Sequence, residues 1–424
     1  MCILNSRNSG ERFLTVRGLF VAVALCAGVV YGDDWPQFNG PGLDNISQET
    51  GLLKQWPESG PKMLWAKAGF GGGYATVAIA DGTIYTTGKV GDNMIVFALN
   101  MDGTTKWQVA NGPGWSGSLP GVRCTPTIDG EHVYVMSGNG RVVCLQAADG
   151  TEVWAVDVKD KYNGQFGDWG YAESLLIDGD KVICTPAGNT VTMVALDKST
   201  GAEIWKSGPL NVAAGYVSPI VMPHGDRHLV IGSTGKGIFG VDAADGKLLW
   251  NHEQVNAHGI NAQTPLYHDG HVFTSSGWDT GSVLLKLSED GAAVTEVWRN
   301  KDLDNDFGSV IFLDGHFYGF NWLNNSRGQF VCVEFGSGKT VYAEFPPGRT
   351  NKGAITWADE MFYCYDEGGV VWLGTADATG PVQIVSQFRI VNGGDQHWAH
   401  PVVSNGVLYI RHGNYLHAFD VGAG

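Results

Sequence analysis

A large aromatic residue that closes a strand recurs along the chain at intervals of 42 to 51 residues. In register, these residues are Trp65, Trp107, Trp154, Trp205, Trp250 and Trp298, followed by the weaker Tyr342 and Phe388. An internal repeat of this length is typical of a four-stranded propeller blade, which cannot bury its faces without neighbours. Eight closing aromatics therefore predict eight blades.

A second signal, Asp-Gly or Asn-Gly, keeps the same phase as the aromatics. It occurs at residues 81–82, 129–130, 178–179, 269–270, 314–315 and 405–406. These dipeptides favour two-residue hairpins, because the turn requires positive φ. The segments that follow, such as HVYVMSG and HFYGFNW, alternate in the manner of strands. The 61 glycines, about twice the usual share, suit short strands joined by tight turns.

The two ends of the chain predict how the ring closes. The last segment, HPVVSNGVLYIRHGNYLHAFDV, supplies three strands, whereas GPKMLWAKAG near the start supplies one strand without partners. We expect the N-terminal strand to complete the C-terminal blade, which leaves no open edge. The sequence therefore predicts an all-β, eight-bladed β-propeller with four-stranded antiparallel blades over residues 33–424. Residues 33–60 are expected to form an N-terminal tail or cap over one face.

Residues 1–32 have the pattern of a secretory signal peptide. Three arginines precede an apolar run at residues 19–30, which is shorter than the roughly 20 residues of a membrane span. Cys26 follows Leu25, which is larger than the residue that lipoprotein processing prefers, so lipid anchoring is the less favoured alternative. We expect a periplasmic or secreted protein without a transmembrane segment.

The composition excludes several partners. The formal net charge is −16, and loss of the predicted leader, with three arginines and one glutamate, makes it −18. A chain this acidic lacks the excess of positive charge that binds nucleic acid or an anionic membrane surface. The leader also carries two of the seven cysteines. The remaining five, which include no adjacent pair and no CxxC, are Cys124, Cys144, Cys184, Cys332 and Cys364. Buried small hydrophobes are the favoured interpretation, with one disulfide left open.

One repeat carries a family resemblance. Ala195, Asp197, Thr200, Gly201 and Trp205 resemble the tryptophan-docking motif of propellers of the pyrroloquinoline quinone (PQQ) type, and residues 240–250 repeat it with Gly for Ala. The resemblance covers nearly all of the mature chain. It implies that the six repeat tryptophans pack between neighbouring blades and tie them together, rather than binding a ligand.

The resemblance implies two functional classes. The first is the PQQ-dependent dehydrogenases, which commonly place a disulfide of adjacent cysteines over the quinone, a Trp beneath it, and Glu, Asn and Asp around Ca²⁺. The second is non-catalytic and similar to BamB, binding partners through its loops. The absence of adjacent cysteines and of a CxxCH haem site favours a ligand- or protein-binding module. A dehydrogenase of alcohols or polyvinyl alcohol, with PQQ and Ca²⁺, is the alternative. No catalytic residue is assigned.

Acidic residues at alternate positions form the best metal candidate. Asp302, Asp304 and Asp306 start a segment that would need Gly at its sixth position and Glu at its twelfth to resemble an EF-type calcium loop, but Phe307 and Leu313 stand there. This favours a solvated acidic loop. The histidines are scattered singly without an HExxH pattern, so we assign no metal.

Alignment of the blades predicts a ring of side chains at one mouth of the central channel. Hydroxylic residues begin most innermost strands: Thr76, Thr125, Ser174, Ser218, Thr264 and Ser309, with Ala354 and His400 as exceptions. Two residues earlier stand Tyr74, Arg123, Ala172, Tyr216, Ala262, Phe307, Lys352 and Trp398, which we name the ring positions.

Two of the ring positions, Arg123 and Lys352, are cations. Such a pair among aromatic residues suits an anionic ligand that is planar or extended, such as the quinone tricarboxylate, an acidic peptide or a sugar acid. The alternative is that both cations pair with nearby carboxylates such as Glu173 and Asp168.

Five tryptophans outside the repeat register are expected on the same face. Trp115, Trp169 and Trp398 lie in connections between blades, and Trp278 and Trp322 lie in turns between second and third strands. They either pack the long loops together or form an aromatic funnel that stacks on a sugar, a cofactor ring or a peptide. We expect a monomer that binds a protein, a small molecule or a sugar at this loop face.

Overall fold

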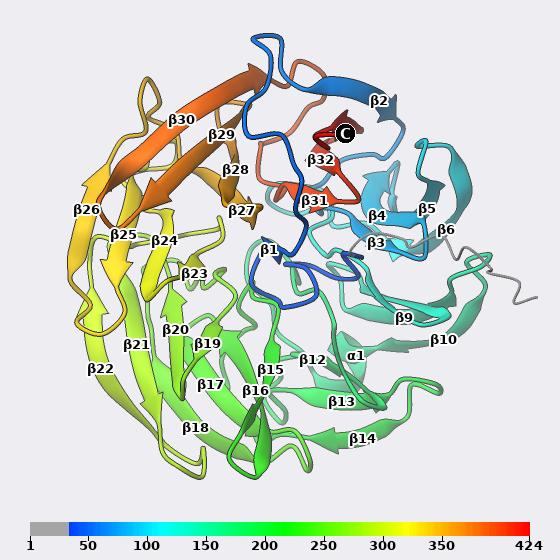
Figure 1. Ribbon diagram of the computed structural model, residues 1–424. Coiled ribbons are helices and arrows are strands. Elements are labelled where there is room, and N and C mark those ends of the chain that lie inside the picture. Colours follow the sequence, from blue (N-terminus) through cyan, green and yellow to red (C-terminus); the bar gives the residue numbers. More distant parts are fainter. Residues whose placement is uncertain (1–33) are drawn as a thin grey trace, which may run out of the picture. The chain divides into compact units, whose positions relative to one another are not determined.

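The computed structural model describes residues 34–424, so the predicted leader lies outside the described residues. Eight antiparallel sheets are arranged in a ring around a common axis (Figure 1), which confirms the predicted eight-bladed propeller. In the described residues, the single α-helix is the short α1 (Val158–Tyr162), between the second and third blades. No helix of residues 34–424 is both long and apolar enough to cross a membrane.

The first four blades each contain four strands, which follow one another from the inside of the ring outward. Blade 1 comprises β3 (Ala78–Ala80), β4 (Thr83–Val90), β5 (Asn93–Asn100) and β6 (Thr105–Pro113). Blade 2 comprises β7 (Thr127–Asp129), β8 (His132–Met136), β9 (Arg141–Gln146) and β10 (Glu152–Asp157). Blade 3 comprises β11 (Leu176–Asp178), β12 (Lys181–Cys184), β13 (Val194–Asp197) and β14 (Glu203–Lys206). Blade 4 comprises β15 (Ile220–His224), β16 (Arg227–Thr234), β17 (Gly237–Asp242) and β18 (Leu248–Glu253).

The remaining blades follow the same order, with additions from the N-terminal segment. Blade 5 comprises β19 (Leu266–His268), β20 (His271–Ser275), β21 (Ser282–Leu287) and β22 (Val294–Asn300). Blade 6 comprises β23 (Ile311–Leu313), β24 (His316–Phe320), β25 (Phe330–Glu334) and β26 (Thr340–Glu344). Blade 7 comprises β27 (Gly353–Ala358), β28 (Met361–Asp366), β29 (Val370–Asp377) and β30 (Gly380–Arg389), with β1 (Ile46–Ser47) parallel to β27. Blade 8 comprises β31 (Val402–Ser404), β32 (Val407–His412), β33 (Tyr415–Asp420) and, outermost, β2 (Lys62–Ala68).

The N-terminal strand closes the ring. Strand β2 pairs antiparallel with β33, so that Lys62 lies opposite Asp420 and Ala68 opposite Tyr415. The three C-terminal strands thus gain the fourth strand that the sequence analysis expected. The blade is completed by the two ends of the chain, and β33 presents no free edge.

A β-bulge marks the register of the repeat aromatics in every blade. In blade 3, Ala195 pairs with Trp205, but Leu196 pairs with Glu203, so Ile204 is the extra residue. The indole Nε1 of Trp205 donates to the carbonyl O of Ala243 in blade 4 at 2.9 Å. Trp65, Trp107, Trp154 and Trp298 make the same kind of bond to the next blade, at 2.8 to 3.0 Å.

Three junctions depart from this pattern. In blade 6 the hydroxyl of Tyr342 has no hydrogen-bond partner. The indole N–H of Trp250 in blade 4 has no hydrogen-bond partner, and His224 Nε2 contacts the carbonyl O of Ser288 in blade 5 at 2.7 Å instead. In blade 7 the bulge places Ser386, not Phe388, in the register of the repeat aromatics. The assignment of Phe388 to that register is therefore wrong, because it is displaced by two residues.

Trp56 of the N-terminal segment fills the junction that Ser386 leaves. Its backbone N–H donates to the hydroxyl of Ser386 at 2.8 Å. Its ring lies 5.5 Å from the ring of Phe388 and 5.9 Å from that of Tyr363, between centroids. An aromatic from the N-terminal segment thus packs where the repeat itself supplies a small polar residue.

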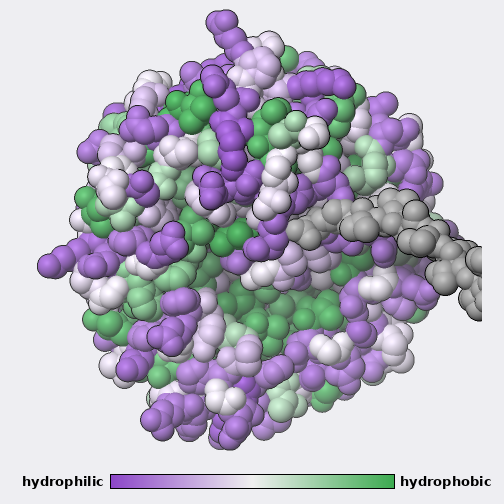
Figure 2. Space-filling model, in the orientation of Figure 1, coloured by the Kyte–Doolittle hydropathy of each residue, from purple (hydrophilic) through white to green (hydrophobic). Residues whose placement is uncertain are grey.

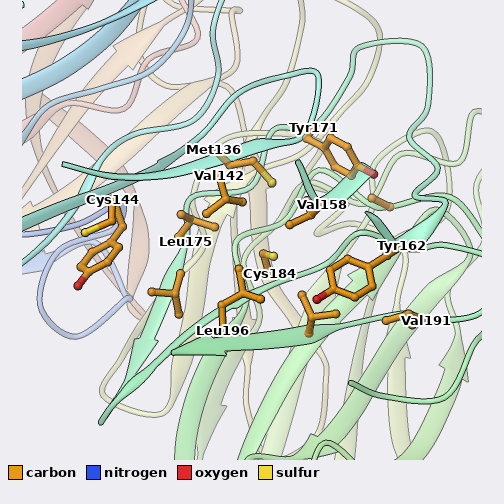
Figure 3. Close-up of a cluster of buried hydrophobic side chains, with 14 of the residues drawn as sticks. Met136, Val142, Cys144, Val158, Tyr162, Tyr171, Leu175, Cys184, Val191 and Leu196 are labelled. Atoms are coloured by element: carbon orange, nitrogen blue, oxygen red, sulfur yellow. The ribbon is translucent and has the colours of Figure 1, made fainter. Parts of the chain in front are cut away.

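The hydrophobic core is divided among the blade junctions. The described residues contain eight buried clusters, and each combines side chains of two neighbouring blades. Figure 3 shows the cluster between blades 2 and 3, where Met136 and Val142 face Cys184 and Leu196. All five cysteines of the described residues are buried free thiols, so a disulfide among them is excluded. Burial between blades ties each sheet to both of its neighbours.

The N-terminal segment, residues 34–60, runs across one face of the ring and reaches its centre at β1 (Figure 1). Trp35 pairs with Ile79 in the middle of β3, and Leu52 pairs with Gly422. Asn45 donates a hydrogen bond from its side chain to the hydroxyl of Ser309. Figure 2 shows that apolar side chains gather near the middle of the face seen in Figure 1. The ring positions precede the innermost strands, whereas β1 pairs with the C-terminal end of β27. The N-terminal segment therefore crosses the opposite face of the ring from the ring positions.

Candidate functional site

A pocket of about 690 Å³ lies on the axis of the propeller, and all eight ring positions line it. Seven aromatic residues contribute to its lining: Phe38, Tyr74, Trp169, Tyr216, Trp278, Phe307 and Trp398. A pocket of this size, lined by aromatic side chains with a few polar groups, is typical of ligand sites. The alignment of repeats thus located residues that lie together in one pocket.

Hydrogen bonds between blades hold the backbone beneath the ring positions. The backbone N–H of Thr76 donates to the hydroxyl of Thr125 at 3.2 Å, and that of Thr125 donates to Ser174 at 3.0 Å. Ser174 continues the series to Ser218, also at 3.0 Å. Each of these hydroxylic residues lies two positions after a ring position. The hydrogen bonds between blades therefore fix the backbone that carries this part of the pocket lining.

Phe38 and His400 close the end of the pocket nearest the N-terminal segment. Their ring centroids are 4.8 Å apart. His400 Nε2 lies 3.1 Å from the carbonyl O of Phe307, and Nδ1 lies 3.0 Å from the hydroxyl of Ser309. The carbonyl requires a proton on Nε2, so Nδ1 accepts from Ser309. Burial lowers the pKa of His400 to about 4, which keeps the ring neutral at physiological pH.

Lys352 lies between two carboxylates in the wall of the pocket. Its ammonium group pairs with the carboxylate of Asp306 and is 4.0 Å from Oε1 of Glu367. Trp398 donates its indole N–H to the same Oε1 at 2.6 Å. Burial raises the pKa of Asp306 and that of Glu367, the latter to about 7, although Lys352 opposes both shifts. Lys352 does pair with carboxylates, but Glu173 and Asp168 are not its partners.

Arg123 differs from Lys352 because no carboxylate of the described residues forms an ion pair with it. Its guanidinium donates to the carbonyl O atoms of Leu119 and Gly121 at 2.9 and 3.4 Å. The Cζ atom lies 5.0 Å from the centroid of the Tyr74 ring, a cation–π distance. The alternative that both cations pair with carboxylates therefore holds for Lys352 and does not hold for Arg123. Arg123 is a cation compensated by backbone and ring alone.

Glu173 is instead buried and bonded to the backbone. Its Oε1 accepts the backbone N–H of Thr185 at 3.0 Å. Burial raises its pKa to about 8, so the carboxyl is mostly protonated at neutral pH. A neutral carboxylic acid needs no cation, which explains why Glu173 does not attract Arg123.

The predicted solvated acidic loop is wrong for two of its three aspartates. Asp304 is 3% exposed and accepts the backbone N–H groups of Asp279, at 2.7 Å, and of Gly281. Asp306 is 7% exposed and pairs with Lys352. Asp302 is exposed and accepts from the hydroxyl of Thr340 at 2.6 Å. The loop thus supports the pocket wall rather than facing solvent.

Asp304 holds the turn that carries Trp278. Trp278 and Asp279 both have positive φ, 52° and 61°, a conformation that is strained for a bulky side chain. The Trp278 ring lies 5.9 Å from that of Trp322 and 5.8 Å from that of His258, between centroids. The turn therefore fixes an indole at the mouth of the pocket.

The five loop tryptophans divide between the two interpretations. Trp169, Trp278 and Trp398 line the pocket, as a funnel requires. Trp115 does not line it. Its ring packs 5.3 Å from that of Phe166 between centroids, and its N–H donates to the carbonyl of Ser118. Trp322 does not line the pocket either, and its ring packs against that of Trp278. Three of the tryptophans thus face the cavity and two pack loops.

Sequence reasoning missed several lining residues, including Phe38, Glu367 and Asp395. Glu367 lies in the turn between the second and third strands of blade 7. The same class of turn placed Trp278 and Trp322 on this face, so the alignment of repeats could have predicted Glu367 as a lining residue. Phe38 carries no such signal, because it lies before the first repeat.

The pocket does not suit a quinone held by calcium. Its two closely placed carboxylates, Asp306 and Glu367, already face the ammonium group of Lys352, where a cation would have to lie. Within residues 34–424 no group of three or more His, Cys, Asp or Glu side chains could hold a metal ion. No cysteine lines the pocket, so the covering disulfide also lacks its residues.

The fold and its axial pocket define a PQQ-like, eight-bladed propeller. Residues 92–344 match the family model described as outer membrane protein assembly factor BamB, and the chain belongs to this family.

The relatives show how far the likeness extends. BamB of Nitrosomonas eutropha is 30% identical over 131 residues, which cover 31% of this chain and 28% of that protein. The chain thus matches less than a third of that relative's length. The crystal structure of BamB from Moraxella catarrhalis superposes with a TM-score of 0.60 at 18% identity, covering 82% of this chain and 94% of that one. A europium-containing methanol dehydrogenase gives a TM-score of 0.66 at 12% identity, covering 89% of each chain. At these identities the solved structures show a shared fold alone.

Proposed function

We propose that the chain is an exported binding propeller that acts as an interaction scaffold and holds a protein partner on the face that carries the pocket. The observation that carries the proposal is the aromatic pocket, which is bordered by exposed loops. Asn325, Ser326 and Gln396 line it and are exposed. Two apolar residues of the same loops are also exposed, Leu323 by 44% and Val391 by 81%. Exposed apolar residues around a concave aromatic site are typical of a protein interface.

The family supports a protein as the partner. Its description, outer membrane protein assembly factor, points to proteins of that assembly as candidates. The pattern of residues 1–32 supports export to the periplasm, with lipid anchoring through Cys26 as the less favoured arrangement. A single propeller with a closed ring is consistent with a monomer. A small molecule or a sugar is the alternative occupant of the pocket.

The alternative function is a PQQ-dependent dehydrogenase. Its support is the fold shared with methanol dehydrogenase. The arrangement of Lys352 between Asp306 and Glu367 argues against it, because the carboxylates that would bind Ca²⁺ are neutralised by a lysine. Incubation of the purified protein with PQQ and Ca²⁺, followed by absorbance and dye-reduction measurements, tests it directly. Dye reduction with an alcohol would establish the dehydrogenase.

Photo-cross-linking from the pocket face tests the binding function. A photoreactive amino acid at Asn325 or Gln396 should cross-link a protein in cells, whereas the same residue at Ile204 should not. Ile204 is a suitable control because it is 41% exposed and lies on the outer strand β14. The partner, identified and purified, should bind the purified propeller, and Leu323→Glu should weaken this binding while Ile204→Glu leaves it unchanged. Equal cross-linking from both faces would contradict the proposal.

A further inference from the structure

We propose that the pocket receives the C-terminal end of a peptide chain, with its single carboxylate at Arg123 and its apolar side chains against the aromatic wall. This inference rests on the proposed protein-binding function and specifies the part of the partner that is bound.

Arg123 supplies the recognition of the carboxylate. A guanidinium has five N–H donors, and Arg123 directs one bond each to the carbonyl groups of Leu119 and Gly121. The remaining donors have no carboxylate partner within the described residues. A planar guanidinium matches a carboxylate with two parallel hydrogen bonds, which are strong when partly buried. The aromatic face of Tyr74 holds the group in the pocket wall.

The charges of the lining allow one carboxylate and disfavour several. Asp306, Glu367 and Asp395 line the pocket, and apart from histidines its only basic side chains are Lys352 and Arg123. Lys352 is occupied by its own two carboxylates. A ligand with several negative charges would therefore meet repulsion beyond Arg123. The cation pair that the sequence predicts for a tricarboxylate or an acidic peptide thus gives way to a site for a ligand with one anionic group.

Glu367 adds the second half of the recognition. Its Oε1 accepts from Trp398, but its Oε2 is buried and has no hydrogen-bond partner, and the side chain is only 9% exposed. A buried acceptor without a donor costs free energy, which a bound N–H group would recover. A peptide carries backbone N–H donors beside its terminal carboxylate, whereas a simple apolar acid carries none.

The shape of the pocket favours a chain end over a passing strand. Phe38 and His400 close one end of the cavity, so a chain cannot thread along the axis. The volume of about 690 Å³ is within the range of pockets for drug-sized ligands, and thus takes a few residues. The seven aromatic residues of the lining offer these residues an apolar contact surface.

Calorimetric titration of the full mature chain tests the inference. The probes are the peptide Ala-Ser-Val-Leu with a free C-terminal carboxylate, the same peptide with a C-terminal amide, and phenylacetate as a small apolar acid. The free acid should bind at least about tenfold more tightly than the amide, the factor that corresponds to one charge-assisted hydrogen bond. Arg123→Met should bring this ratio close to one, and Arg123→Lys should retain part of it. Arg141→Met is the matched control, because Arg141 forms an exposed ion pair with Glu152 in blade 2.

Four results would overturn the inference. Three are equal binding of acid and amide, an unchanged ratio in Arg123→Met with a wild-type melting temperature, and no binding of the free acid at millimolar concentration. The fourth is phenylacetate binding as tightly as the peptide, which would make the ligand a small acid. If only the inference is wrong, the partner found by cross-linking should still bind the Arg123→Met variant. If the proposed function is wrong, no partner should cross-link specifically to the pocket face.

Discussion

Trp205 of blade 3 donates its indole N–H to the carbonyl O of Ala243 in blade 4, 2.9 Å away, and Gly246 of blade 4 lies against the face of the same ring. A Cβ on Gly246 would come within 2.5 Å of the indole, and its φ of +75° also favours glycine. The Trp205 side chain is 6% exposed. At five of the eight junctions, one tryptophan of the repeat thus joins two sheets by packing and by a hydrogen bond.

Replacing Trp205 should destabilise the ring without changing the pocket. Trp205→Ala leaves a void between blades and should lower the free energy of unfolding by about 3 to 5 kcal/mol. Trp205→Phe should cost more than Trp250→Phe, because Trp205 loses a hydrogen bond of about 1 kcal/mol that Trp250 does not make. Denaturant unfolding measures both differences. A loss below about 0.5 kcal/mol for Trp205→Ala would be inconsistent with a packed core residue.

Residues within the repeat could be placed from the sequence, and residues outside it could not. Ring positions such as Tyr74 and Lys352 could be aligned because every blade places the same step of its chain at the channel mouth. The exceptions arise where a side chain from outside the repeat replaces one within it. Trp56 packs beside Ser386, and Phe38 closes the pocket, although both precede the first full blade. No periodic pattern can indicate such residues.

Charge pairing was harder to predict than position. Lys352 forms an ion pair with Asp306, which lies in the preceding repeat. Glu173 is next to a ring position in sequence, but burial raises its pKa and keeps the carboxyl neutral. Whether a carboxylate accepts a cation depends on its desolvation and on which backbone N–H groups it already holds. These are properties of packing, and residue types along the sequence do not carry them.

Strand β2 should be required for a closed ring. A chain that begins at residue 71 lacks β2 and Trp56, exposing the edge of β33. It should aggregate or melt well below the chain that begins at residue 33. A chain that begins at residue 56 keeps both features but loses β1 and Phe38, and serves as the matched control. Similar melting of the chains that begin at 56 and 71 would show that β2 contributes nothing to closure.

Burial of Glu173 should make stability depend on pH. Its pKa is raised from 4.5 in the unfolded chain to about 8 in the fold, so the folded state binds more protons between these values. The contribution of Glu173 to stability is therefore fully present below pH 4.5 and is lost as pH rises toward 8. Glu173→Gln should flatten the fall in the free energy of unfolding between pH 5 and pH 8. Glu203→Gln, at an exposed site, is the control and should leave that slope unchanged. An identical slope in wild type and Glu173→Gln would mean that the carboxyl is ionised in the fold.

Removing the ammonium group of Lys352 should lower the free energy of unfolding, because it leaves two buried carboxylates without a cation. Lys352→Met strands the carboxylates of Asp306 and Glu367 in a buried wall without a cation, and losing one partner of such a pair costs about 3 to 5 kcal/mol. The double variant Lys352→Met with Asp306→Leu removes the stranded charge as well, leaving a single carboxyl that protonates readily at Glu367. It should recover at least half of the lost free energy of unfolding, measured by denaturant at neutral pH. If the double variant is no more stable than Lys352→Met, the cost lies in packing around Lys352 and not in unpaired charge.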